Sequence, residues 1–321
     1  MQATSRVEQP VDPTGGSTPT RMQMKSSRSW ERVFDDIHQG LRARELWAHL
    51  GWQDIRQRYR RSILGPFWIT ISQGVIALGL GLLYGVLFGS PFETFLPYVS
   101  TGLIVWTFIS NCLMEGMETF IANEGLIKHL PAPLSVYALR TVWRQMIMFA
   151  HNIIVYVIVF AIFFKYLDQP YSLNTKGACV APMYCHPGLS WTYLLAIPGF
   201  LLVVLNAAWV SMFLGIISTR FRDFPQLVGA LIQLLFYMTP IVWPVDQLLA
   251  PGGHRHALAQ FVKPLLDLNP FYHLIQVVRG PLTGGGVSWV NWAAVGLMTV
   301  VGWSLALMFM RNYRARVSYW V

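Results

Sequence analysis

The sequence has few charged residues, and this scarcity argues against a soluble protein. Asp, Glu, Lys and Arg make up 12% of its 321 residues, whereas roughly one quarter is typical of soluble domains. Hydrophobic residues account for 54%. The net charge of +9 does not favour nucleic-acid binding, because the basic residues cluster beside apolar stretches and not on a polar domain. The composition therefore predicts a membrane protein.

The sequence also lacks the short motifs of nucleotide hydrolysis, metalloprotease chemistry and thiol redox chemistry. It contains no GxxxxGK[ST], HExxH or Cys-x-x-Cys pattern, and no Ser/His/Asp arrangement is evident. Ionisable residues inside the apolar stretches are few, with His151 beside Asn152 as the main case. Ion-coupled transporters usually keep titratable groups near the membrane midplane. We therefore expect no catalytic residues, no metal and no cofactor in this chain, and an external source of energy.

Six apolar stretches are long enough to cross a bilayer. The first, from Phe67 to Gly89, contains no Asp, Glu, Lys, Arg or His. At about 1.5 Å per residue, about 20 such residues match the roughly 30 Å hydrocarbon core. The others run from Leu96 to Met114, Gln145 to Phe164, Trp191 to Ile217, Gln226 to Trp243 and Val287 to Met310. The expected fold is an all-α integral membrane protein, with a six-helix transmembrane domain at residues 66–315.

The positions of the arginines predict the orientation in the membrane. They are concentrated before the first span, after the fourth and after the sixth, at Arg42, Arg44, Arg56, Arg58, Arg60, Arg61, Arg220, Arg222, Arg311, Arg314 and Arg316. With six spans these segments lie on one side, so both termini are predicted to be cytoplasmic. Residues 1–30 are expected to be a disordered tail and residues 316–321 a short C-terminal tail. No cleavable signal pattern precedes Phe67.

Residues 31–65 are expected to contain an amphipathic helix lying along the cytoplasmic surface. From Leu41 to Ile63, an apolar stripe recurs at spacings of three and four and is flanked by arginines: Trp52, Ile55, Tyr59 and Ile63 form the stripe. Gly65 and Pro66 end the helix where the chain turns into the membrane. A cluster of charges that only sets topology is the alternative interpretation.

Two loops are unusual. Residues from Ala122 to Leu130, after the second span, have a helical pattern that Pro131 ends, and they form either a docking surface or a solvated connector. Residues 244–286 are long for a loop yet partly apolar, and the apolar stretch after Asn269 is too short to span. We expect a re-entrant or interfacial helical pair there, on the outer face.

Two of the three cysteines lie in the loop between the third and fourth spans. This loop faces outward in the predicted orientation, and Cys179 and Cys185 are either joined in a disulfide or left as free thiols there. A metal site is not expected, because only His186 accompanies the pair. Cys112 lies in a span and is expected to pack as a small apolar residue.

Three motifs together resemble one family. Arg58 to Trp68, RYRRSILGPFW, is similar to the signature before the first span of membrane subunits of polysaccharide and teichoic-acid ABC exporters, the Wzm-like branch of the ABC-2 permeases. Arg222 to Leu227, with Tyr237 to Ile241, resembles a second landmark, at the fifth span. Asn269 to Arg279 resembles a third, ahead of the last span. The resemblance covers about residues 40–315, in the family's order and spacing.

This resemblance implies a homodimer in the bacterial plasma membrane, paired with two copies of a separate ATPase that binds ATP and Mg²⁺. It implies a cytoplasmic gate near a polyprenyl-linked polysaccharide, a short helix that contacts the ATPase, and an external re-entrant pair. By position, the gate and headgroup-binding residues are Trp52, Arg56, Arg58, Tyr59, Arg60, Arg61 and Ser62. The coupling residues are Asn123, Glu124, Lys128 and His129, and the external ones are Asn269, Pro270 and Arg279. The Trp-rich sequence and long N-terminal tail are similar to actinobacterial exporters of cell-wall galactan, whereas the loop from Tyr166 to Ser190 departs from the family.

A sliding sugar polymer needs aromatic platforms more than fixed charges, because its apolar C–H faces stack on rings. Candidate channel residues are Tyr84, Phe88, Trp106, Phe108, Trp209 and Tyr237. For each ring, placement at the membrane interface or in the core is the alternative. The gate arginines are expected to bind either a polyprenyl pyrophosphate or ordinary anionic lipids.

The leading functional hypothesis is an exporter permease and not an enzyme. An ABC-2 permease for a small drug or lipid is the second hypothesis. A membrane glycosyltransferase is the third, and it would need carboxylates at a membrane face. The clustered candidates for such carboxylates are Glu93, Glu115, Glu118 and Glu124, and the sequence has no Asp-x-Asp.

Overall fold

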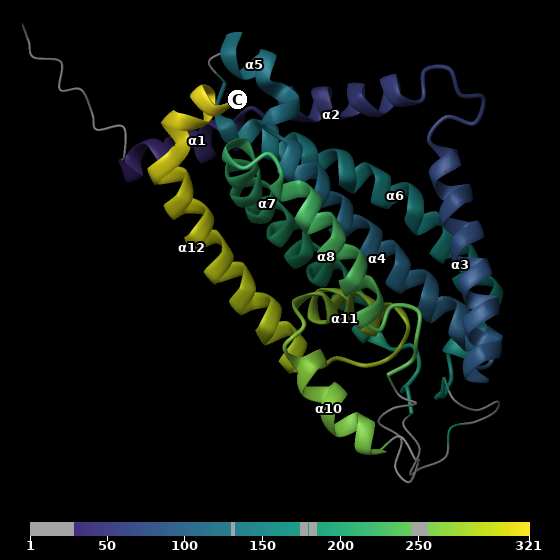
Figure 1. The fold of residues 1–321 in the computed structure, drawn as a ribbon. Coiled ribbons are helices and arrows are strands. Elements are labelled where there is room, and N and C mark those ends of the chain that lie inside the picture. Colours follow the sequence, from purple (N-terminus) through teal and green to yellow (C-terminus); the bar gives the residue numbers. More distant parts are fainter. Residues whose placement is uncertain (1–28, 130–131, 174–178, 180–184, 246–255) are drawn as a thin grey trace, which may run out of the picture.

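The computed structural model describes residues 29–129, 132–173, 179, 185–245 and 256–321. Within them the chain forms helices and no β-strand, and an isolated β-bridge joins Tyr171 and His186. The predicted tail at residues 1–30 falls almost wholly outside the described residues. The helices, labelled in Figure 1, are α1 (Trp30–Arg42), α2 (Arg44–Arg58), α3 (Phe67–Phe88), α4 (Phe92–Glu118), η1 (Ile121–Asn123), α5 (Glu124–His129), α6 (Leu134–Leu167), η2 (Trp191–Leu195), α7 (Ala196–Arg220), α8 (Phe224–Met238), α10 (His256–Asp267), α11 (Pro270–Leu282) and α12 (Trp289–Trp320).

Five of the described helical segments are long and apolar enough to cross a membrane: α3, α4, α6, η2 with α7, and α12. This confirms the all-α membrane fold. The predicted fifth span, Gln226 to Trp243, is shorter than expected, because α8 has 15 residues and about 20 are needed to cross the hydrocarbon core. Pro225 lies in its first turn and Pro240 follows its C-cap residue, Thr239. Prolines suit a helix start and do not continue a helix, so α8 is bounded on both sides.

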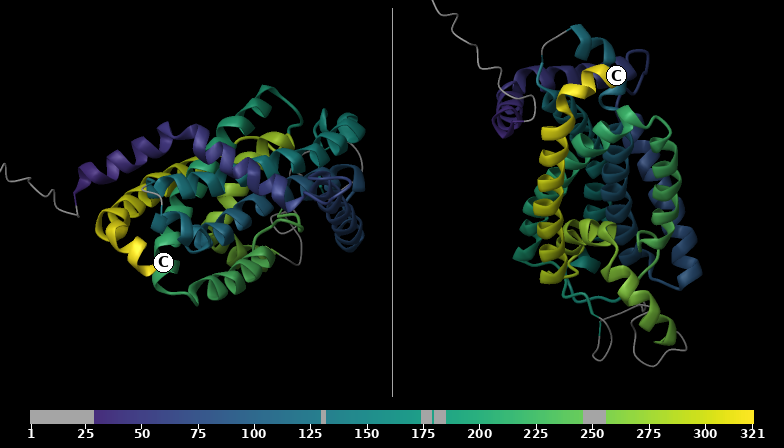
Figure 2. Two further views of the ribbon diagram at one scale, coloured as in Figure 1. Left: turned by 90° about the horizontal axis from the view of Figure 1, so that it is seen from above. Right: turned by 60° about the vertical axis from the view of Figure 1, so that its left-hand side comes forward.

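The bundle is built around α4, which contacts α3, α6, α7, α8 and α11. Most of α4 is buried, and Phe95, Val99 and Phe108 are almost fully enclosed. The outer face of α3 is exposed, as at Val86 and Leu87. Figure 2 shows the long helices side by side along one direction. Apolar side chains that face outward along such helices are suited to lipid tails or to another membrane-embedded chain.

At one end of the bundle α1 and α2 run across the long helices, near α5 and the C-terminus (Figures 1 and 2). Helix α2 packs closely on α6. A Cβ atom added to Gly51 would lie 2.9 Å from the Trp143 ring, and the rings of Trp47 and Trp143 meet edge to face with centroids 5.7 Å apart. Helix α2 is therefore anchored to protein.

The predicted single helix from Leu41 to Ile63, with one apolar stripe, is wrong. The structure has two helices, and α2 ends at Arg58, so Tyr59 and Ile63 lie beyond it. Of the stripe residues Ile55 is buried, whereas Trp52 is 52% exposed and Ile63 is 100% exposed. The repeating pattern was interrupted by the turn that leads to Gly65, whose positive φ of 57° favours glycine.

The predicted C-terminal tail at 316–321 is also wrong, because α12 continues to Trp320. Val317 and Val321 are buried in the same hydrophobic cluster as Val33 of α1 and Leu134 of α6. The C-terminus is therefore packed against the N-terminal helices.

A buried carboxylate joins α1, α6 and α12. Asp36 accepts hydrogen bonds from the backbone N–H groups of Leu134 at 3.1 Å and Ser135 at 3.0 Å, the first residues of α6. Its Oδ2 also lies 2.8 Å from Nε of Arg314. A carboxylate at this position satisfies N–H groups that have no partner within the helix and matches the positive end of the helix dipole.

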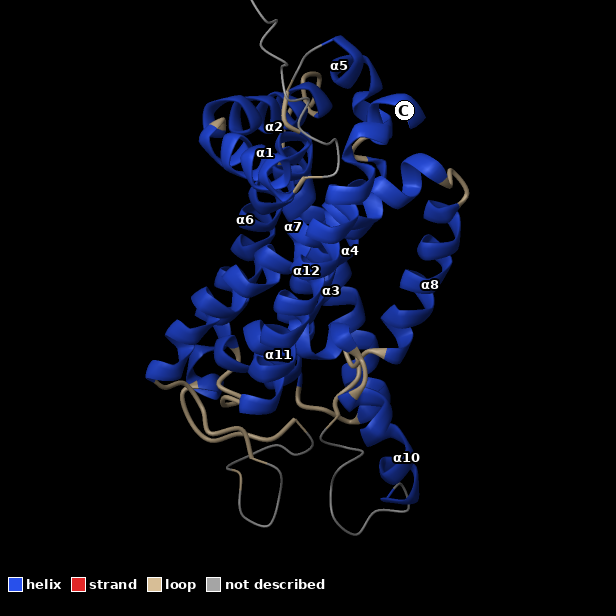
Figure 3. Cartoon of the chain, turned by 90° about the vertical axis from the view of Figure 1, so that its left-hand side faces the viewer, coloured by secondary structure: helices blue, strands red, loops and turns tan. Residues whose placement is uncertain are grey.

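The opposite end carries α10, α11 and the segment that follows α6 (Figures 1 and 3). The predicted helical pair within residues 244–286 is present as α10 and α11. Helix α11 is inserted against α4, α7 and α12, with Leu274, Ile275 and Val278 buried, whereas α10 projects from the bundle. Nearby, Cys179 and Cys185 are joined in a disulfide with their Cα atoms 5.7 Å apart.

Replacing Asp36 with Asn should lower the free energy of unfolding by about 2 to 4 kcal/mol, because Arg314 loses its ionised partner and one of the two helix N–H groups loses its acceptor. Reversible unfolding of the detergent-solubilised protein measures this loss. Asp35 is the matched control, since it is exposed, and Asp35→Asn should change stability little. Equal effects of the two substitutions would contradict the role of Asp36.

Candidate functional site

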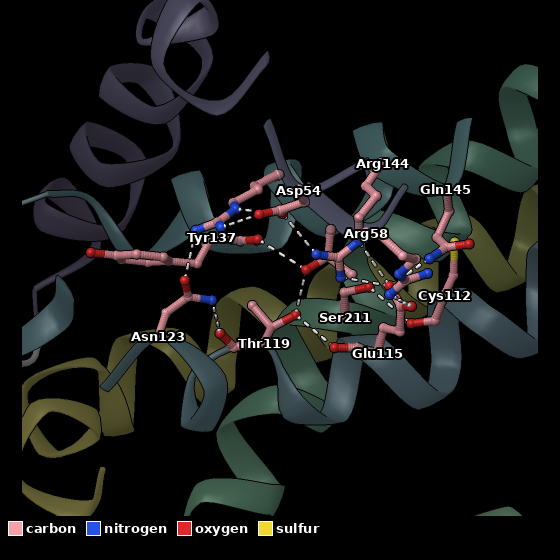
Figure 4. Close-up of polar contacts among 12 residues, drawn as sticks. Asp54, Arg58, Cys112, Glu115, Thr119, Asn123, Tyr137, Arg144, Gln145 and Ser211 are labelled. Atoms are coloured by element: carbon pink, nitrogen blue, oxygen red, sulfur yellow. Dashed lines mark hydrogen bonds and ion pairs between the residues drawn. The ribbon is translucent and has the colours of Figure 1, made fainter. Parts of the chain in front are cut away.

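Two arginines near the start of α6 hold α2 against the bundle. Arg140 and Arg144 are four residues apart and so project from the same helix face. Arg140 donates two hydrogen bonds to the carboxylate of Asp54 in α2, from Nε at 2.9 Å and from Nη2 at 2.6 Å. Arg144 donates from Nη1 to the same carboxylate at 2.8 Å. Figure 4 shows this arrangement.

Glu115 of α4 is the second carboxylate. It accepts hydrogen bonds from Arg144 Nε at 3.0 Å and Nη2 at 2.5 Å, and from Gln145 Nε2 at 2.5 Å. Arg58, the last residue of α2, reaches it at 3.4 Å. We call this set of residues the Asp54–Glu115 network. It joins α2, α4 and α6 through two carboxylates and two largely buried guanidinium groups (Figure 4).

The network continues to the short helices that follow α4. Asn123 of η1 accepts a hydrogen bond from Arg140 Nη1 at 2.7 Å and donates to the Thr119 carbonyl oxygen at 2.7 Å. Helix α5 begins at the next residue, Glu124. Arg140 therefore contacts Asp54 and Asn123 at the same time and so connects α2 to η1.

The charges in this network favour the ionised form of Asp54. Burial alone would raise the pKa of Asp54, but the hydrogen bonds and charges of Arg140 and then Arg144 outweigh it, so its pKa lies below the ordinary value. The side chains of Asp54 and Arg144 are each 18% exposed, so solvent screens this interaction less than at the surface. On α5, a hydrogen bond from Lys128 lowers the pKa of the exposed Glu124.

The predicted gate residues fall into two groups. Arg58 belongs to the Asp54–Glu115 network, and Ser62 accepts a hydrogen bond from the Gly65 backbone N–H at 3.1 Å. Tyr59 is partly buried after the end of α2. The others are exposed on α2 or on the turn that follows it: Trp52, Arg56, Arg60 and Arg61. Within the described part of the chain, no ion pair involves Arg56, Arg60 or Arg61.

The predicted coupling residues lie together at the same end of the bundle. Asn123 is in η1, and Glu124, Lys128 and His129 are in α5, which projects from the bundle (Figure 1). Lys128 pairs with Glu124 at 2.6 Å. Leu126 and Ile127 pack against the cluster that contains Phe120 and Val317. One side of α5 is thus anchored and the other exposed; Leu130 and Pro131 lie outside the described residues.

The predicted channel aromatics do not form one surface. Trp106 and Phe108 are 7% and 2% exposed, and their rings contact other side chains of the core. The prediction that these two residues line a channel is therefore wrong. Trp209 packs tightly against Gly302 of α12, since a Cβ atom added to that glycine would lie 2.1 Å from the Trp209 ring. Tyr237 on α8 is exposed. Tyr84 and Phe88, both in α3, are partly buried, and their rings stack on each other.

The predicted external residues organise α11. Asn269 caps it, since its Oδ1 accepts a hydrogen bond from the Phe271 N–H at 3.0 Å, and Pro270 occupies its first position. Both choices are typical of a helix start. Arg279, near the other end of α11, is buried.

Sequence reasoning missed most of the Asp54–Glu115 network. Glu115 was considered only as a candidate carboxylate of a glycosyltransferase, and Asp54, Arg140, Arg144 and Gln145 were not singled out. The signal was present, because two arginines four residues apart lie near the start of α6, a helix of 34 residues in which Lys165 is the one other Asp, Glu, Lys or Arg. Their partners come from α2 and α4, 86 to 90 and 29 residues away in sequence, and no local pattern identifies them.

Comparisons with known proteins agree with the architecture. The family model described as ABC-2 type transporter matches residues 45–282. Two relatives from Klebsiella pneumoniae, each named O-antigen export system permease protein RfbA, are 24% identical over 196 residues, which are 61% of this chain and 68% of theirs. A protein of the same name from Myxococcus xanthus is 21% identical over 238 residues, which are 72% of this chain and 82% of its own.

Replacing Asp54 with Asn should destabilise the protein by about 2 kcal/mol at neutral pH, because Arg140 and Arg144 lose a shared ionised acceptor. Since the folded-state pKa of Asp54 is lowered, its contribution is complete above the ordinary value of about 3.9 and is lost as pH falls through the lowered pKa. The difference in unfolding free energy between wild type and variant should therefore stay constant from pH 8 to 5 and shrink at more acidic pH.

Unfolding of the solubilised protein at each pH measures this difference. Glu45, exposed in the first turn of α2, is the control position, and Glu45→Gln should show neither effect. If the difference in unfolding free energy between wild type and Asp54→Asn grew as the pH fell, the lowered pKa of Asp54 would be contradicted.

Proposed function

The chain belongs to the ABC-2 type transporter family, and from this premise we propose that it is the membrane-spanning subunit of an exporter for a polysaccharide. As a family member it is a multi-pass membrane protein and a transporter subunit, not an enzyme, and it works with an ABC ATPase. The names of its relatives, O-antigen export permeases, support a polysaccharide as cargo, and we propose that this polymer is linked to a lipid. A cell-wall galactan or a teichoic-acid-like polymer belongs to the same proposal.

The observation that carries the mechanism is the Asp54–Glu115 network. Helix α5 is the proposed docking element for the ATPase, with Lys128 and His129 exposed on it. Asn123, directly before α5, is bonded to Arg140, which holds Asp54 of α2. We infer that movement of the docked ATPase reaches α2 through this connection. The two largely buried guanidinium groups of the network each contact two residues at once, so a shift of one partner changes the contact with the other. A network of ion pairs can transmit movement in this way.

Helix α2 and the turn after it form the proposed gate. Arg56, Arg60 and Arg61 are exposed there, just before α3 enters the membrane. A polyprenyl pyrophosphate presents oxyanions at this level, and guanidinium groups bind phosphate oxygens in a bidentate manner. The arginines at this end support the proposed orientation, with α2, α5 and both termini in the cytoplasm.

A homodimer would enclose the polymer path. Helix α8 exposes an apolar face that includes Leu227, Leu231 and Leu234, and Tyr237 lies on the same helix. Helix α8 packs loosely on the bundle, and α3 is exposed along much of its length. These surfaces are suited to a second copy, because apolar helix faces pack against one another in a membrane as well as against lipid. The second candidate function, export of a small drug or lipid, shares this architecture.

Copurification and depletion test the proposed function. The tagged chain should copurify with a separate ATPase that contains a phosphate loop, and cells depleted of the chain should accumulate a polyprenyl-linked polymer on the cytoplasmic face. Mass spectrometry of the trapped glycolipid identifies the cargo. Nucleotide hydrolysis by the chain alone, or accumulation of a small lipid without any polymer, would contradict the proposal.

Replacing Arg60 with Gln should reduce stimulation of the transporter's ATPase by lipid-linked substrate, by about threefold to tenfold, because one exposed phosphate contact is removed. Basal ATPase activity should be unchanged. Arg44, exposed at the other end of α2, provides the matched control. If Arg44→Gln and Arg60→Gln behave alike, the arginines bind lipid headgroups without selectivity.

A further inference from the structure

Arg279 is a buried cation at the outer end of the bundle. Its side chain is 1% exposed, and its guanidinium carbon lies 4.0 Å from the centre of the Tyr98 ring. Nη1 donates a hydrogen bond to the Pro240 carbonyl oxygen at 2.7 Å, and Nε makes a long contact of 3.5 Å with Gln276 Oε1. The arginine therefore bridges α11, α4 and the chain that follows α8.

The pairing of this guanidinium is incomplete. Nη2 is buried and has no hydrogen-bond acceptor among the described residues, and no carboxylate of the described chain forms an ion pair with Arg279. At the other end of the protein, by contrast, Arg140 and Arg144 are each bonded to carboxylates. A buried cation without a counter-ion is costly, and an oxygen-bearing anion would relieve that cost.

Arg279 lines a cavity of about 420 Å³, within the range that holds small ligands. Lys263 and Asp267 of α10 and Tyr272 and Gln276 of α11 line it as well, together with Trp292 of α12. Tyr272, Gln276 and Trp292 are partly exposed. The cavity thus combines aromatic surface with amide, carboxylate and ammonium groups, a mixture that suits the C–H faces and hydroxyls of a sugar.

His186, in the loop that departs from the family, belongs to one wall of this cavity. Its backbone pairs with that of Tyr171 at 2.8 and 3.1 Å. The Gly188 N–H donates to the Gly284 carbonyl oxygen at 3.2 Å, which attaches the loop to the turn after α11. The disulfide between Cys179 and Cys185 ends one residue before His186. A crosslink there restricts the wall and so preorganises the cavity.

We propose that this outer cavity binds a sugar unit that carries an oxyanion, either a carboxylate or a phosphate group. Arg279 Nη2 and Lys263 Nζ bind the oxyanion, and Tyr272 and Trp292 contact the sugar ring. The inference rests on the proposed function, since such a unit belongs to the exported polymer and occupies the cavity as the polymer emerges. The disulfide between Cys179 and Cys185 holds the adjacent His186 in place in the wall of this site.

Calorimetric titration of the purified full-length chain in lipid nanodiscs tests the proposal. Glucose 1-phosphate and glucuronate should bind, and inorganic phosphate and glucose should bind at least about tenfold more weakly, because each lacks one half of the recognised group. Failure of both charged sugars to bind overturns the proposal. If inorganic phosphate binds as tightly as glucose 1-phosphate, the cavity is a simple anion site and the proposal is overturned. If glucose binds as tightly as glucuronate, the proposed role of the charge is overturned.

Variants assign the binding to this cavity. Lys263→Gln should weaken glucuronate binding by about threefold to fivefold, whereas Lys165→Gln, at an exposed lysine that does not line the cavity, should leave it unchanged. Arg279→Lys should weaken it by about tenfold or more, since a lysine cannot bond Pro240 and the ligand in the same geometry. Its melting temperature is measured in parallel to confirm that it folds.

Cys179→Ser combined with Cys185→Ser should also weaken binding, and dithiothreitol should reproduce that loss in the wild type but not in the double variant. Wild-type affinity in both Lys263→Gln and the double variant overturns the proposal whether or not Arg279→Lys folds. The proposed function fails separately: charged sugars that bind while depleted cells accumulate no polymer contradict export, and intact export without sugar binding contradicts only this site.

Discussion

Guanidinium groups at the edge of an apolar bundle must be paired, and this constraint determines how α2 is placed. Arg140 and Arg144 project from one face of α6 and are largely enclosed, so each needs ionised acceptors nearby. Asp54 from α2 and Glu115 from α4 provide them. The close approach at Gly51 allows α2 to reach this position. The packing of α2, and its connection to η1 and α5, depend on these four charges.

Buried charges are fully paired at one end of the bundle and incompletely paired at the other. At the end with α1, α2 and α5, Asp36 and Asp54 are each shared between cations or N–H groups, so carboxylates and donors are matched. At the other end, Arg279 has a carbonyl and a ring as neighbours and one buried nitrogen without an acceptor. Matched pairs hold helices in place, whereas an incompletely paired cation favours a ligand. This difference puts the proposed mechanical connection at one end and the proposed binding cavity at the other.

The sequence predicted the elements better than their contacts. The spans and the helical pair within residues 244–286 follow from hydrophobic length and from prolines, which act within a few residues of chain. The prediction of one apolar stripe from Trp52 to Ile63 was wrong, because the spacing of the apolar residues continues into the turn after α2, where side chains no longer share one helix face. The core placement of Trp106 and Phe108 was not predictable, because an aromatic ring in a span has the same sequence signature beside lipid, in a core or along a channel.

The sequence alone determined that the chain is an all-α membrane protein with its arginines gathered in a few segments, because hydrophobic length and charge position act locally and need no partner. The tertiary structure decided which arginines are paired. Arg56 and Arg140 are the same residue type, but one is exposed and the other is bonded to Asp54 and Asn123. Ion pairing in an apolar bundle depends on side chains from distant helices meeting within about 3 Å, and only the packed fold brings them together.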